Sequence, residues 1–582
     1  MPRGIGETGF GDGPGLFLYP VNWEIHWENG RTDRPMPSDL KEALEQVHRP
    51  LALHARVDGS ISVRFLDESD SADWAAPGES LPAGWVRIPP VRPEDLGDAA
   101  FRRDHRLGLA YVAGSMAHGI ASEELVESAA RAGCLGFYGA AGQPPERVES
   151  AIQRLQGSLG AKPFGFNLLY SPQEQGLEDA HARLYLRYGV RLVEASAYLD
   201  MSLALARYRL TGLRVGPNGE PIPVNRVVAK VSRVEVAQKF LSPTPPRLVG
   251  ELLSRGEITE QQAQAATRLP LADEITAEAD SGGHTDNRPA ITLLPTLIAL
   301  RDRLAGEAAR RGWHQPARVG LGGGIATPHA VAAAFAMGAA YVLVGTVHQA
   351  CVESGTSDAA RTLLAATGQA DTAMAPAADM FEMGVKVQVL KRGTLFAMRA
   401  QKLYDIYRAY PSFDAVPPAD RQTVETQVLR RPFAQVWEDC VAYFLTRDPG
   451  QISRAQADPR HQMALVFRWY LATASRWATR GVTDRQADFQ IWCGPSMGAF
   501  NEWAHGSLLQ DPANRSLPLV AFNLLRGAAA LKRAEFARML GIGSAAVSPV
   551  PVSFERMGNL LPAGFQSPEA GYATQASARV PA

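Results

Sequence analysis

The stretch GLGGGIATPHAVAAAFAMGAAYVLVGT, residues 320–346, decides the fold class of this chain. It begins with an apolar run that ends in three glycines. An alanine-rich segment typical of a helix follows, and then a second apolar run, YVLVGT. Continuous apolar runs are typical of parallel strands, because helices cover both faces of such a sheet. The order strand, helix, strand therefore predicts a right-handed βαβ unit.

The same rhythm runs through the preceding text, from about residue 106. Eight apolar runs alternate with segments typical of amphipathic helices, such as SEELVESAARAG. This pattern is typical of an α/β protein with a (β/α)8 (TIM) barrel. A doubly wound open sheet is the alternative that the pattern leaves open. The predicted strands are 107–115, 134–140, 163–169, 190–196, 226–232, 274–280, 318–324 and 341–346.

The sequence pattern predicts four regions within the 582 residues. A small β-containing domain is expected at 1–105 and the barrel at 106–355. Within the barrel, 233–273 is too long for an ordinary connection, and we interpret it as a helical insertion and a candidate lid at a strand's carboxyl end. An aromatic-rich helical substrate or partner region is expected at 356–565, and a disordered tail at 566–582.

The bulk composition excludes several classes of protein. A formal net charge of −1 gives no basic field for nucleic acid, and no apolar run reaches the roughly 18 residues that a membrane-spanning helix needs. The N-terminal text lacks the apolar core of a secretory signal. The four cysteines are far apart, which fits a reducing cytoplasm and predicts neither a metal site nor disulfides.

The glycines of the opening stretch predict a phosphate site. Gly322, Gly323 and Gly324 end one strand, and Gly345 with Thr346 ends the next. Bare backbone N–H groups beside a helix start bind anions, and barrels commonly hold phosphate after their seventh and eighth strands. Tight left-handed turns without a ligand are the alternative.

A second glycine pair ends the sixth predicted strand, in the text EADSGGHTDN at 278–287. Gly282 and Gly283 have no side chain, so a flat ligand could lie against their main chain with His284 at its edge. A histidine there could donate a hydrogen bond or a proton near neutral pH. A turn with a surface histidine is the alternative, and the nearby phosphate site favours the functional interpretation.

Lys230 lies in the apolar text RVVAKVS, where an inward ammonium is costly unless it pairs with a charge. It could stabilise the anionic edge of a reduced ring, or it could simply pair with Glu194 or Asp280. Asn167, on the third predicted strand, could contact a ligand, but asparagine is also common in strand-end turns. Further polar or glycine strand endings that are candidates for ligand contact are Gly114, Ser115, Met116 and Asn167.

These motifs resemble those of PfaD-type proteins, the trans-acting enoyl reductases of polyunsaturated fatty acid synthases and trans-acyltransferase polyketide synthases. They are also similar to nitronate monooxygenases (2-nitropropane dioxygenases) and to the flavin-dependent enoyl-carrier-protein reductase of bacterial fatty acid synthesis. The resemblance runs from about residue 16 to 560, and SGGHTDNRP with the C-terminal helical text points to the PfaD type. The matching stretches are AGSMAHGIAS (113–122), PFGFNLLYSP (163–172), RVVAKVSR (226–233), ITAEADSGGHTDNRP (275–289), RVGLGGGIATP (318–328), GAAYVLVGTVHQACVESGTS (338–357) and DFQIWCGPSMGAFNEW (488–503).

The resemblance implies an FMN-containing barrel that reduces an enoyl thioester on an acyl carrier protein, with NADPH as hydride donor. It implies two catalytic residues: Lys230 near the N1/O2 edge of the flavin, and His284 as donor to the thioester oxygen or as the acid that protonates Cα. The implied cofactor contacts are Gly114, Ser115, Met116, Asn167, Lys230, Gly282 and Gly283 for the ring and its chain, and Gly322, Gly323, Gly324, Gly345 and Thr346 for the phosphate.

One departure from the family text is the sequence GGHTDN in place of GGHxG, which leaves the roles of Asp286 and Asn287 open. Two alternative functions stay open as well. One is a nitronate-oxidising flavoprotein that uses oxygen, and the other is a docking subunit of a synthase that has lost its flavin. The intact glycines at three strand ends argue against the second. The aromatic-rich helical half has enough apolar surface for a homodimer.

Overall fold

The computed structural model divides the chain into two compact units. One unit comprises residues 1–90 with 533–547, and the other comprises residues 91–532 with 548–582. The tail expected at 566–582 lies outside the described residues. The structure describes residues 25–27, 40–57, 60–66, 84–171, 175–217, 219–542 and 545–558.

The smaller unit contains the predicted N-terminal β-containing domain. Its elements are β1 (Ile25–Trp27), α1 (Leu40–Glu45), β2 (Leu51–Ala55), β3 (Ile61–Phe65) and β4 (Trp85–Ile88). The strands form one sheet in the order β1-β3-β2-β4, with a parallel β1–β3 pair and two antiparallel pairs. The buried Arg533 joins residues 533–547 to this unit, because its guanidinium donates to the backbone carbonyls of Leu44, Gln46 and Arg49.

The larger unit contains a closed barrel of eight parallel strands, as predicted, so the alternative of an open sheet is wrong. The strands are β5 (Tyr111–Ala113), β6 (Leu135–Tyr138), β7 (Gly165–Leu169), β8 (Leu192–Ser196), β11 (Arg226–Val231), β12 (Glu274–Glu278), β14 (Arg318–Gly322) and β15 (Val342–Val344). They follow one another around the barrel in chain order, and β15 pairs with β5 to close it. Each lies within one of the eight predicted stretches.

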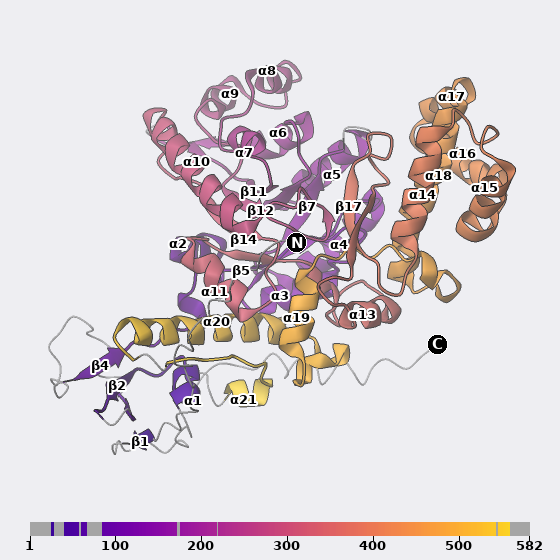
Figure 1. The fold of residues 1–582 in the computed structure, drawn as a ribbon. Coiled ribbons are helices and arrows are strands. Elements are labelled where there is room, and N and C mark those ends of the chain that lie inside the picture. Colours follow the sequence, from indigo (N-terminus) through magenta and orange to yellow (C-terminus); the bar gives the residue numbers. More distant parts are fainter. Residues whose placement is uncertain are drawn as a thin grey trace, which may run out of the picture. The chain divides into compact units, whose positions relative to one another are not determined.

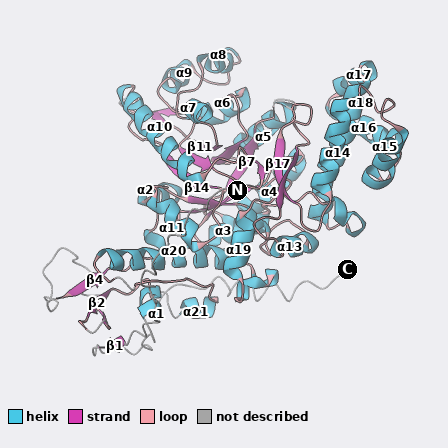
Figure 2. Ribbon diagram, viewed as in Figure 1, coloured by secondary structure: helices cyan, strands magenta, loops and turns pink. Residues whose placement is uncertain are grey.

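Helices surround the barrel strands, as Figures 1 and 2 show. The elements that precede, connect or directly follow the barrel strands include α2 (Ala99–His105), α3 (Glu123–Arg131), α4 (Pro145–Leu159), α5 (Gln175–Arg187), α6 (Leu203–Leu210), β9 (Arg214–Val215), β10 (Pro221–Ile222), α7 (Val234–Phe240), α8 (Pro246–Ser254), α9 (Glu260–Ala266), α10 (Ala290–Arg310), α11 (Pro328–Ala336) and α12 (Thr346–Gln349). On α2, the Phe101 ring stacks on Tyr341 at a centroid distance of 4.3 Å. Residues 91–105, expected in the N-terminal domain, therefore belong to the larger unit.

The expected helical insertion is present, but it does not follow the carboxyl end of a strand directly. Its first helix, α7, is the ordinary barrel helix after β11, and α8 and α9 come next. The segment then returns to its own start, since Leu271 and Ala272 donate backbone hydrogen bonds to Ser242 and Phe240 immediately before β12. The extra helices thus belong to the connection into the amino end of β12, and the expected lid over a strand's carboxyl end is wrong.

The part expected to be mostly helical at 356–565 also contains strands. β16 (Thr372–Pro376) and β17 (Lys386–Leu390) form an antiparallel sheet with β13 (Gly283–His284), in the order β13-β17-β16. The two longer strands share an apolar cluster with neighbouring helices, and this cluster contains Val387, Val389 and Phe467. The helices of this part are α13 (Asp358–Ala365), α14 (Phe396–Ala409), α15 (Pro418–Thr423), α16 (Phe433–Arg447), α17 (Pro449–Ala457), α18 (Pro459–Arg480), α19 (Ser496–Ala504), α20 (Leu517–Met539) and α21 (Phe554–Gly558).

None of the described helices combines the length and the apolar composition that crossing a membrane demands.

Candidate active site

The predicted site residues gather at the carboxyl ends of the barrel strands. Because all eight strands are parallel in one closed barrel, these ends form a single rim. Consecutive strands around this rim are β11, β12, β14, β15 and β5. The rim carries Lys230 on β11, residues 282–284 after β12, 322–324 at the end of β14, 345–346 after β15, 114–116 after β5, and Asn167 on β7.

Gly324 and Gly345 have open space where a side chain would begin. No neighbouring atom lies within 4 Å of a Cβ built on either residue. They follow the ends of neighbouring strands, since Gly322 at the end of β14 pairs with Leu343 of β15 and each glycine comes two residues after this pair. Thr346 follows as the first residue of α12. Within the described residues neither glycine N–H donates to a backbone carbonyl, so both donors are available to an anion such as a phosphate.

The other glycines of these strand ends are required by the packing of the chain. A Cβ on Gly323, whose φ is +83°, would lie 2.6 Å from a backbone carbonyl oxygen after β12. A Cβ on Gly114 would lie 2.5 Å from the Leu343 side chain. A Cβ on Gly322 would lie 3.2 Å from Thr276. These positions lack a side chain because protein atoms already occupy the space.

The segment after β5 is fixed by hydrogen bonds to the rest of the rim. The Ser115 N–H donates to Oε2 of Glu194 at 3.1 Å, and the Ser115 hydroxyl donates to the same oxygen. The Met116 carbonyl accepts the Ala121 N–H at 3.2 Å, and it occupies the space that a Cβ on Gly139 would need. The backbone of this turn is therefore held in place without a ligand.

Asn167 is buried on β7, and its amide group bridges to the next strand. Its Nδ2 donates to the Glu194 carbonyl oxygen at 3.1 Å and to the Ser196 hydroxyl at 3.0 Å. Its own backbone carbonyl accepts from the Tyr185 hydroxyl at 2.7 Å. Both amide hydrogens are used in this way, which favours the structural alternative for Asn167.

Lys230 lies between two carboxylates. Its ammonium is 3.2 Å from Glu278 and 3.8 Å from Glu194. Burial acts to lower the pKa of Lys230, but the two carboxylates outweigh it and raise the pKa, so the side chain stays charged. Of the two partners that the sequence suggested, Glu194 is present, and Glu278 takes the place of Asp280.

Glu194 was named in the sequence only as a partner for Lys230, yet it is central to the rim. It is fully buried in β8, and burial raises the pKa of its carboxyl against the opposing effects of Lys230 and Ser115. Its Oε1 has no hydrogen-bond partner among the described residues. A buried oxygen without a partner is costly, and a ligand at the rim can satisfy it. The available signal was a carboxylate within the apolar text VRLVEAS.

His284 lies on β13 and faces a carboxylate that the sequence analysis did not propose. Its Nε2 is 3.1 Å from Oδ1 of Asp379, and its side chain is 41% exposed. Desolvation acts to lower the pKa of His284, but the Asp379 carboxylate raises it, and the net direction is upward. Glu278 raises this pKa further and Lys230 lowers it, which ties the histidine electrostatically to the β11 and β12 ends. The Asp379 carboxylate thus favours the protonated form of the imidazole.

Gly282 and Gly283 contact the chain itself. A Cβ on Gly282 would lie 2.8 Å from the backbone nitrogen of Cys493. Gly283 has a φ of +83°, and the Trp492 ring is 3.8 Å from its Cβ position. The structure therefore accounts for Gly282 by its packing against Cys493 and for Gly283 by its positive φ, rather than by the flat ligand that we expected there.

Trp492 also brings a second histidine to this part of the molecule. Its ring stacks on His118, with centroids 5.5 Å apart and planes inclined by 18°. Burial and the charge of Arg476 lower the pKa of His118 to about 4, so its imidazole is neutral. Neither residue was proposed for the site, although His118 lies in AGSMAHGIAS and Trp492 in DFQIWCGPSMGAFNEW.

Asp286 and Asn287 fasten the loop that follows the histidine. Asp286 accepts hydrogen bonds from the Ser232 hydroxyl at 2.6 Å and from the Arg233 guanidinium at 2.9 Å. The hydrogen bond from Arg233 is the main cause that lowers the pKa of Asp286 to about 2. Asn287 donates to Oδ1 of Asp280 at 2.8 Å. The departure from the family text thus ties this loop to the strand ends of β11 and β12.

Comparison with protein families fits this arrangement of strand ends. The nitronate monooxygenase model matches residues 109–403, half of the chain. The chain belongs to the nitronate monooxygenase family. A second model, the inserted helical domain of [acyl-carrier-protein] S-malonyltransferase, matches residues 410–489, which hold α15 to α18.

Relatives within this nitronate monooxygenase family come from lipid and polyketide synthases. The chain is 44% identical to one of the subunits of the polyunsaturated fatty acid synthase of Thraustochytrium sp. over 455 residues, which are 77% of this chain and 30% of that protein. It is 41% identical to polyketide biosynthesis protein PksE of Bacillus subtilis over 442 residues, which are 76% of this chain and 57% of that protein. The chain therefore spans only part of the length of these relatives.

A solved structure refines the family assignment. The enoyl reductase domain of MlnA, from the macrolactin biosynthesis cluster of Bacillus amyloliquefaciens, superposes with a TM-score of 0.73 and 36% identity. The match covers 76% of this chain and 99% of that domain. The resemblance to PfaD-type enoyl reductases is thereby confirmed.

Proposed function

We propose that this chain is a trans-acting enoyl reductase that reduces the 2,3 double bond of an enoyl thioester in polyunsaturated fatty acid or polyketide synthesis. The enoyl reductase domain of MlnA and the synthase relatives support this role. The observation that carries it is the rim, where two open glycine positions lie on the same barrel end as a charged lysine and a protonatable histidine. A flavin-dependent reductase binds, orients and electrostatically tunes its cofactor, and these three features suit that task.

FMN is the proposed cofactor of this rim. The fit rests on Gly324 and Gly345, whose free N–H groups and open space suit a phosphate, and on the unpartnered Oε1 of Glu194. When bound, FMN would supply the ring that takes up and passes on a hydride, with NADPH as the proposed source. Lys230 would balance negative charge on the cofactor, because its two carboxylate neighbours keep it protonated.

His284 is the proposed donor to the thioester. Negative charge develops on the thioester oxygen as the double bond is reduced, and a positioned donor stabilises it. Because Nε2 faces Asp379, the proton on Nδ1 is the one that a substrate oxygen or Cα would meet. Asp379 raises the pKa of this imidazole, so the donor form persists to a higher pH than in an unpaired histidine. An acyl carrier protein is the proposed bearer of the substrate.

The family model itself favours a second candidate, the oxidation of nitronates. A paired assay separates the two functions. One arm measures NADPH consumption with a crotonyl thioester, and the other measures oxygen uptake with a nitroalkane. We expect rapid NADPH consumption and slow oxygen uptake; the opposite pattern would replace enoyl reduction by nitronate oxidation.

A variant of the histidine tests its role in the same assay. His284→Ala is expected to lower kcat for the crotonyl thioester by about 100-fold, the contribution of a positioned acid, while the flavin content stays unchanged. His314→Ala is the matched control, since His314 is exposed and precedes the amino end of β14. Full activity of His284→Ala would show that His284 has no role in the mechanism.

A further inference from the structure

His284 depends on a carboxylate that lies on a separate hairpin of the chain. Asp379, whose Oδ1 is 3.1 Å from Nε2 of His284, belongs to the loop 377–385 that joins β16 to β17. The strand of the histidine pairs with the same hairpin, because His284 lies opposite Val387 of β17. The position of Asp379 beside the imidazole is therefore set by the contacts that hold this loop.

Helix α18 holds the loop through Arg468. The guanidinium donates from Nε to the Ala378 carbonyl oxygen at 2.8 Å and from Nη1 to Oε1 of Glu382 at 3.2 Å. Ala378 immediately precedes Asp379, and Glu382 follows it three residues later. A planar guanidinium presents its donors in a fixed fork, so the two hydrogen bonds restrain the loop on both sides of the carboxylate.

An aromatic side chain packs the same loop against the same part of the molecule. Phe381 is fully buried, and its ring centroid is 5.4 Å from that of Tyr404 and 5.2 Å from that of Tyr407, both on α14. Phe467, the residue before Arg468 on α18, is 6.4 Å away. Removing the guanidinium therefore leaves the middle of the loop packed on α14 and α18 and releases mainly its first residues.

The charges around the pair explain why its geometry matters. Desolvation acts to lower the pKa of His284, and Asp379 has the largest effect among the charges that oppose it. Glu278 raises this pKa further, and Lys230 lowers it. Burial acts to raise the pKa of Asp379, but His284 and, more weakly, Arg468 lower it, and the net direction is downward. A displaced Asp379 would therefore let the pKa of the imidazole fall.

We propose that Arg468 is a positioning residue for His284, acting through the loop 377–385 and Asp379. The inference rests on the proposed function, in which His284 is the donor to the thioester. A reacting group keeps its geometry only when the residues around it are themselves fixed. Because Arg468 lies within 410–489, the segment that matches the inserted helical domain contributes to the chemistry of the barrel rim.

The pKa of His284 tests the proposal without any substrate. It is measured by NMR on protein with isotope-labelled histidine, and the His284 signal is identified by its absence from His284→Ala. Arg468→Met removes the guanidinium and keeps the apolar stem. The pKa of His284 is expected to fall, because Asp379 is no longer held opposite Nε2. Loss of a positive charge alone would raise this pKa, so the sign of the change separates positioning from direct electrostatics.

Two further variants sharpen the measurement. Arg468→Lys keeps the charge and serves if the methionine variant fails to fold. An ammonium does not reproduce the fork that joins Ala378 to Glu382, so the pKa of His284 is expected to fall here as well, by less. In an Asp379→Asn background, Arg468→Met is expected to have no further effect on this pKa, because Arg468 acts through that carboxylate.

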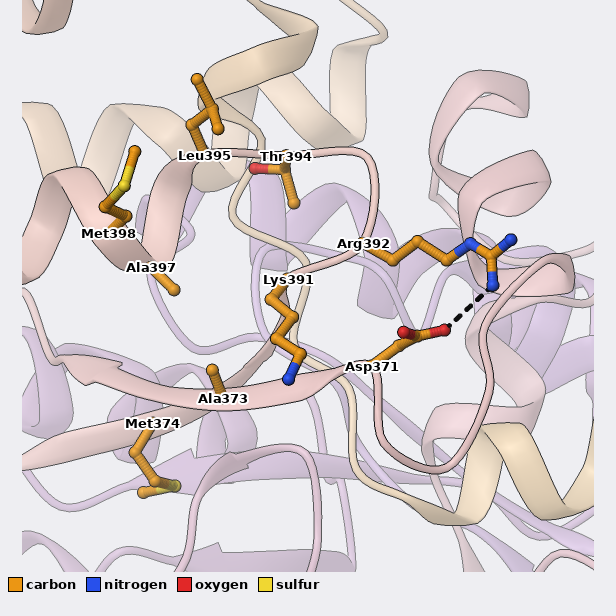
Figure 3. A pocket seen from close by; sticks show the side chains of 9 residues that line it. All are labelled: Asp371, Ala373, Met374, Lys391, Arg392, Thr394, Leu395, Ala397 and Met398. Atoms are coloured by element: carbon orange, nitrogen blue, oxygen red, sulfur yellow. Dashed lines mark hydrogen bonds and ion pairs between the residues drawn. The ribbon is translucent and has the colours of Figure 1, made fainter.

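The other end of the hairpin supplies the matched control. There Arg392 forms an ion pair with Asp371 at 3.2 Å beside a cavity of about 610 Å³, as Figure 3 shows. β16 runs from Thr372 at this end to Pro376 beside the loop, about 14 Å away. Arg392→Met makes the same change of side chain and is expected to leave the pKa of His284 unchanged.

Steady-state kinetics connect the positioning to the reaction. Arg468→Met is expected to lower kcat for the crotonyl thioester by about tenfold, as misplacement of a reacting group does, and to move the alkaline limb of kcat/KM to lower pH.

A pKa of His284 that is unchanged or raised in either Arg468 variant overturns the proposal. An equal fall of this pKa in the Asp379→Asn background, or in Arg392→Met, overturns it as well. A wild-type protein that does not reduce the thioester instead refutes the proposed function. The pKa measurement still decides whether Arg468 positions the imidazole, so the two failures are distinguishable.

Discussion

Two pairs of glycines at the barrel rim look alike in the sequence and differ in the structure. Gly324 and Gly345 face open volume, with no neighbouring atom within 4 Å of the Cβ position. Gly282 and Gly323 face backbone atoms, at 2.8 Å and 2.6 Å from that position. A missing side chain therefore makes room for a ligand at one pair and room for the chain itself at the other.

The β14 and β15 ends and the segment 282–284 have different roles. The β14 and β15 ends offer free N–H donors and space, which suit a cofactor phosphate. The segment at 282–284 packs against 492–493 and pairs with β17, and it thereby fixes His284 opposite Asp379. Substitution of Gly345 is predicted to leave stability intact and to weaken ligand binding, whereas substitution of Gly282 or Gly323 is predicted to lower stability.

Placing an aspartate at one glycine of each pair separates the two pairs most strongly. Gly323→Asp adds a Cβ 2.6 Å from a carbonyl oxygen at a φ of +83°, so the free energy of unfolding is expected to fall by more than about 4 kcal/mol. Gly345→Asp meets open space at a φ of −116°, and a change within about 0.5 kcal/mol is expected. Chemical denaturation measures both free energies of unfolding. Equal stability of the two variants would show that Gly323 and Gly345 do not differ in packing.

A smaller effect is expected from a single methyl group after β12. Gly282→Ala overlaps the Cys493 backbone and is expected to lower the free energy of unfolding by about 2 kcal/mol. Gly157→Ala is the control, because Gly157 lies in α4 with nothing within 4 Å, and alanine there is expected to stabilise by about 0.5 kcal/mol or more. Thermal unfolding compares them. Variants with the same Tm would show that the contact at Gly282 is not tight.

The smallest effect concerns the charge beside His284. Asp379 raises the pKa of this imidazole, so Asp379→Asn is expected to lower it. If the protonated imidazole is the donor, the alkaline limb of kcat/KM then moves to lower pH. By linkage, the stability from this pair is fully present below the unfolded pKa of histidine, is lost as pH rises through the folded pKa, and is absent from the variant. An unchanged pH profile of kcat/KM would show that Asp379 does not influence the reaction.

The barrel could be predicted because its strands are short apolar runs covered by helices, and all eight runs survive in the structure. β16 and β17 were missed because TAMAP and KVQVL are five-residue pieces inside helical text. The expected lid was wrong because the long connection follows α7, so its extra helices lead into the amino end of β12. A sequence gives the length of a connection, and the order of elements within it decides where it lies.

The rim residues could be listed because parallel strands place their carboxyl ends together. The reason for each glycine could not, because spacing does not tell whether protein atoms or open volume lie beside it. Asp379 was missed because it pairs with His284 from 95 residues away along the chain. Glu194 was detectable as a charge in an apolar strand, but its unpartnered oxygen is visible only in three dimensions.

Titration of flavin-free protein with FMN tests the central claim most directly, with riboflavin as the phosphate-free control. The wild-type protein is expected to bind FMN and to prefer it to riboflavin. Gly345→Asp is expected to fold normally, to bind FMN at least about 100-fold more weakly and to lose that preference. Equal FMN affinity in the two proteins contradicts the claim that the open ends of β14 and β15 hold the phosphate.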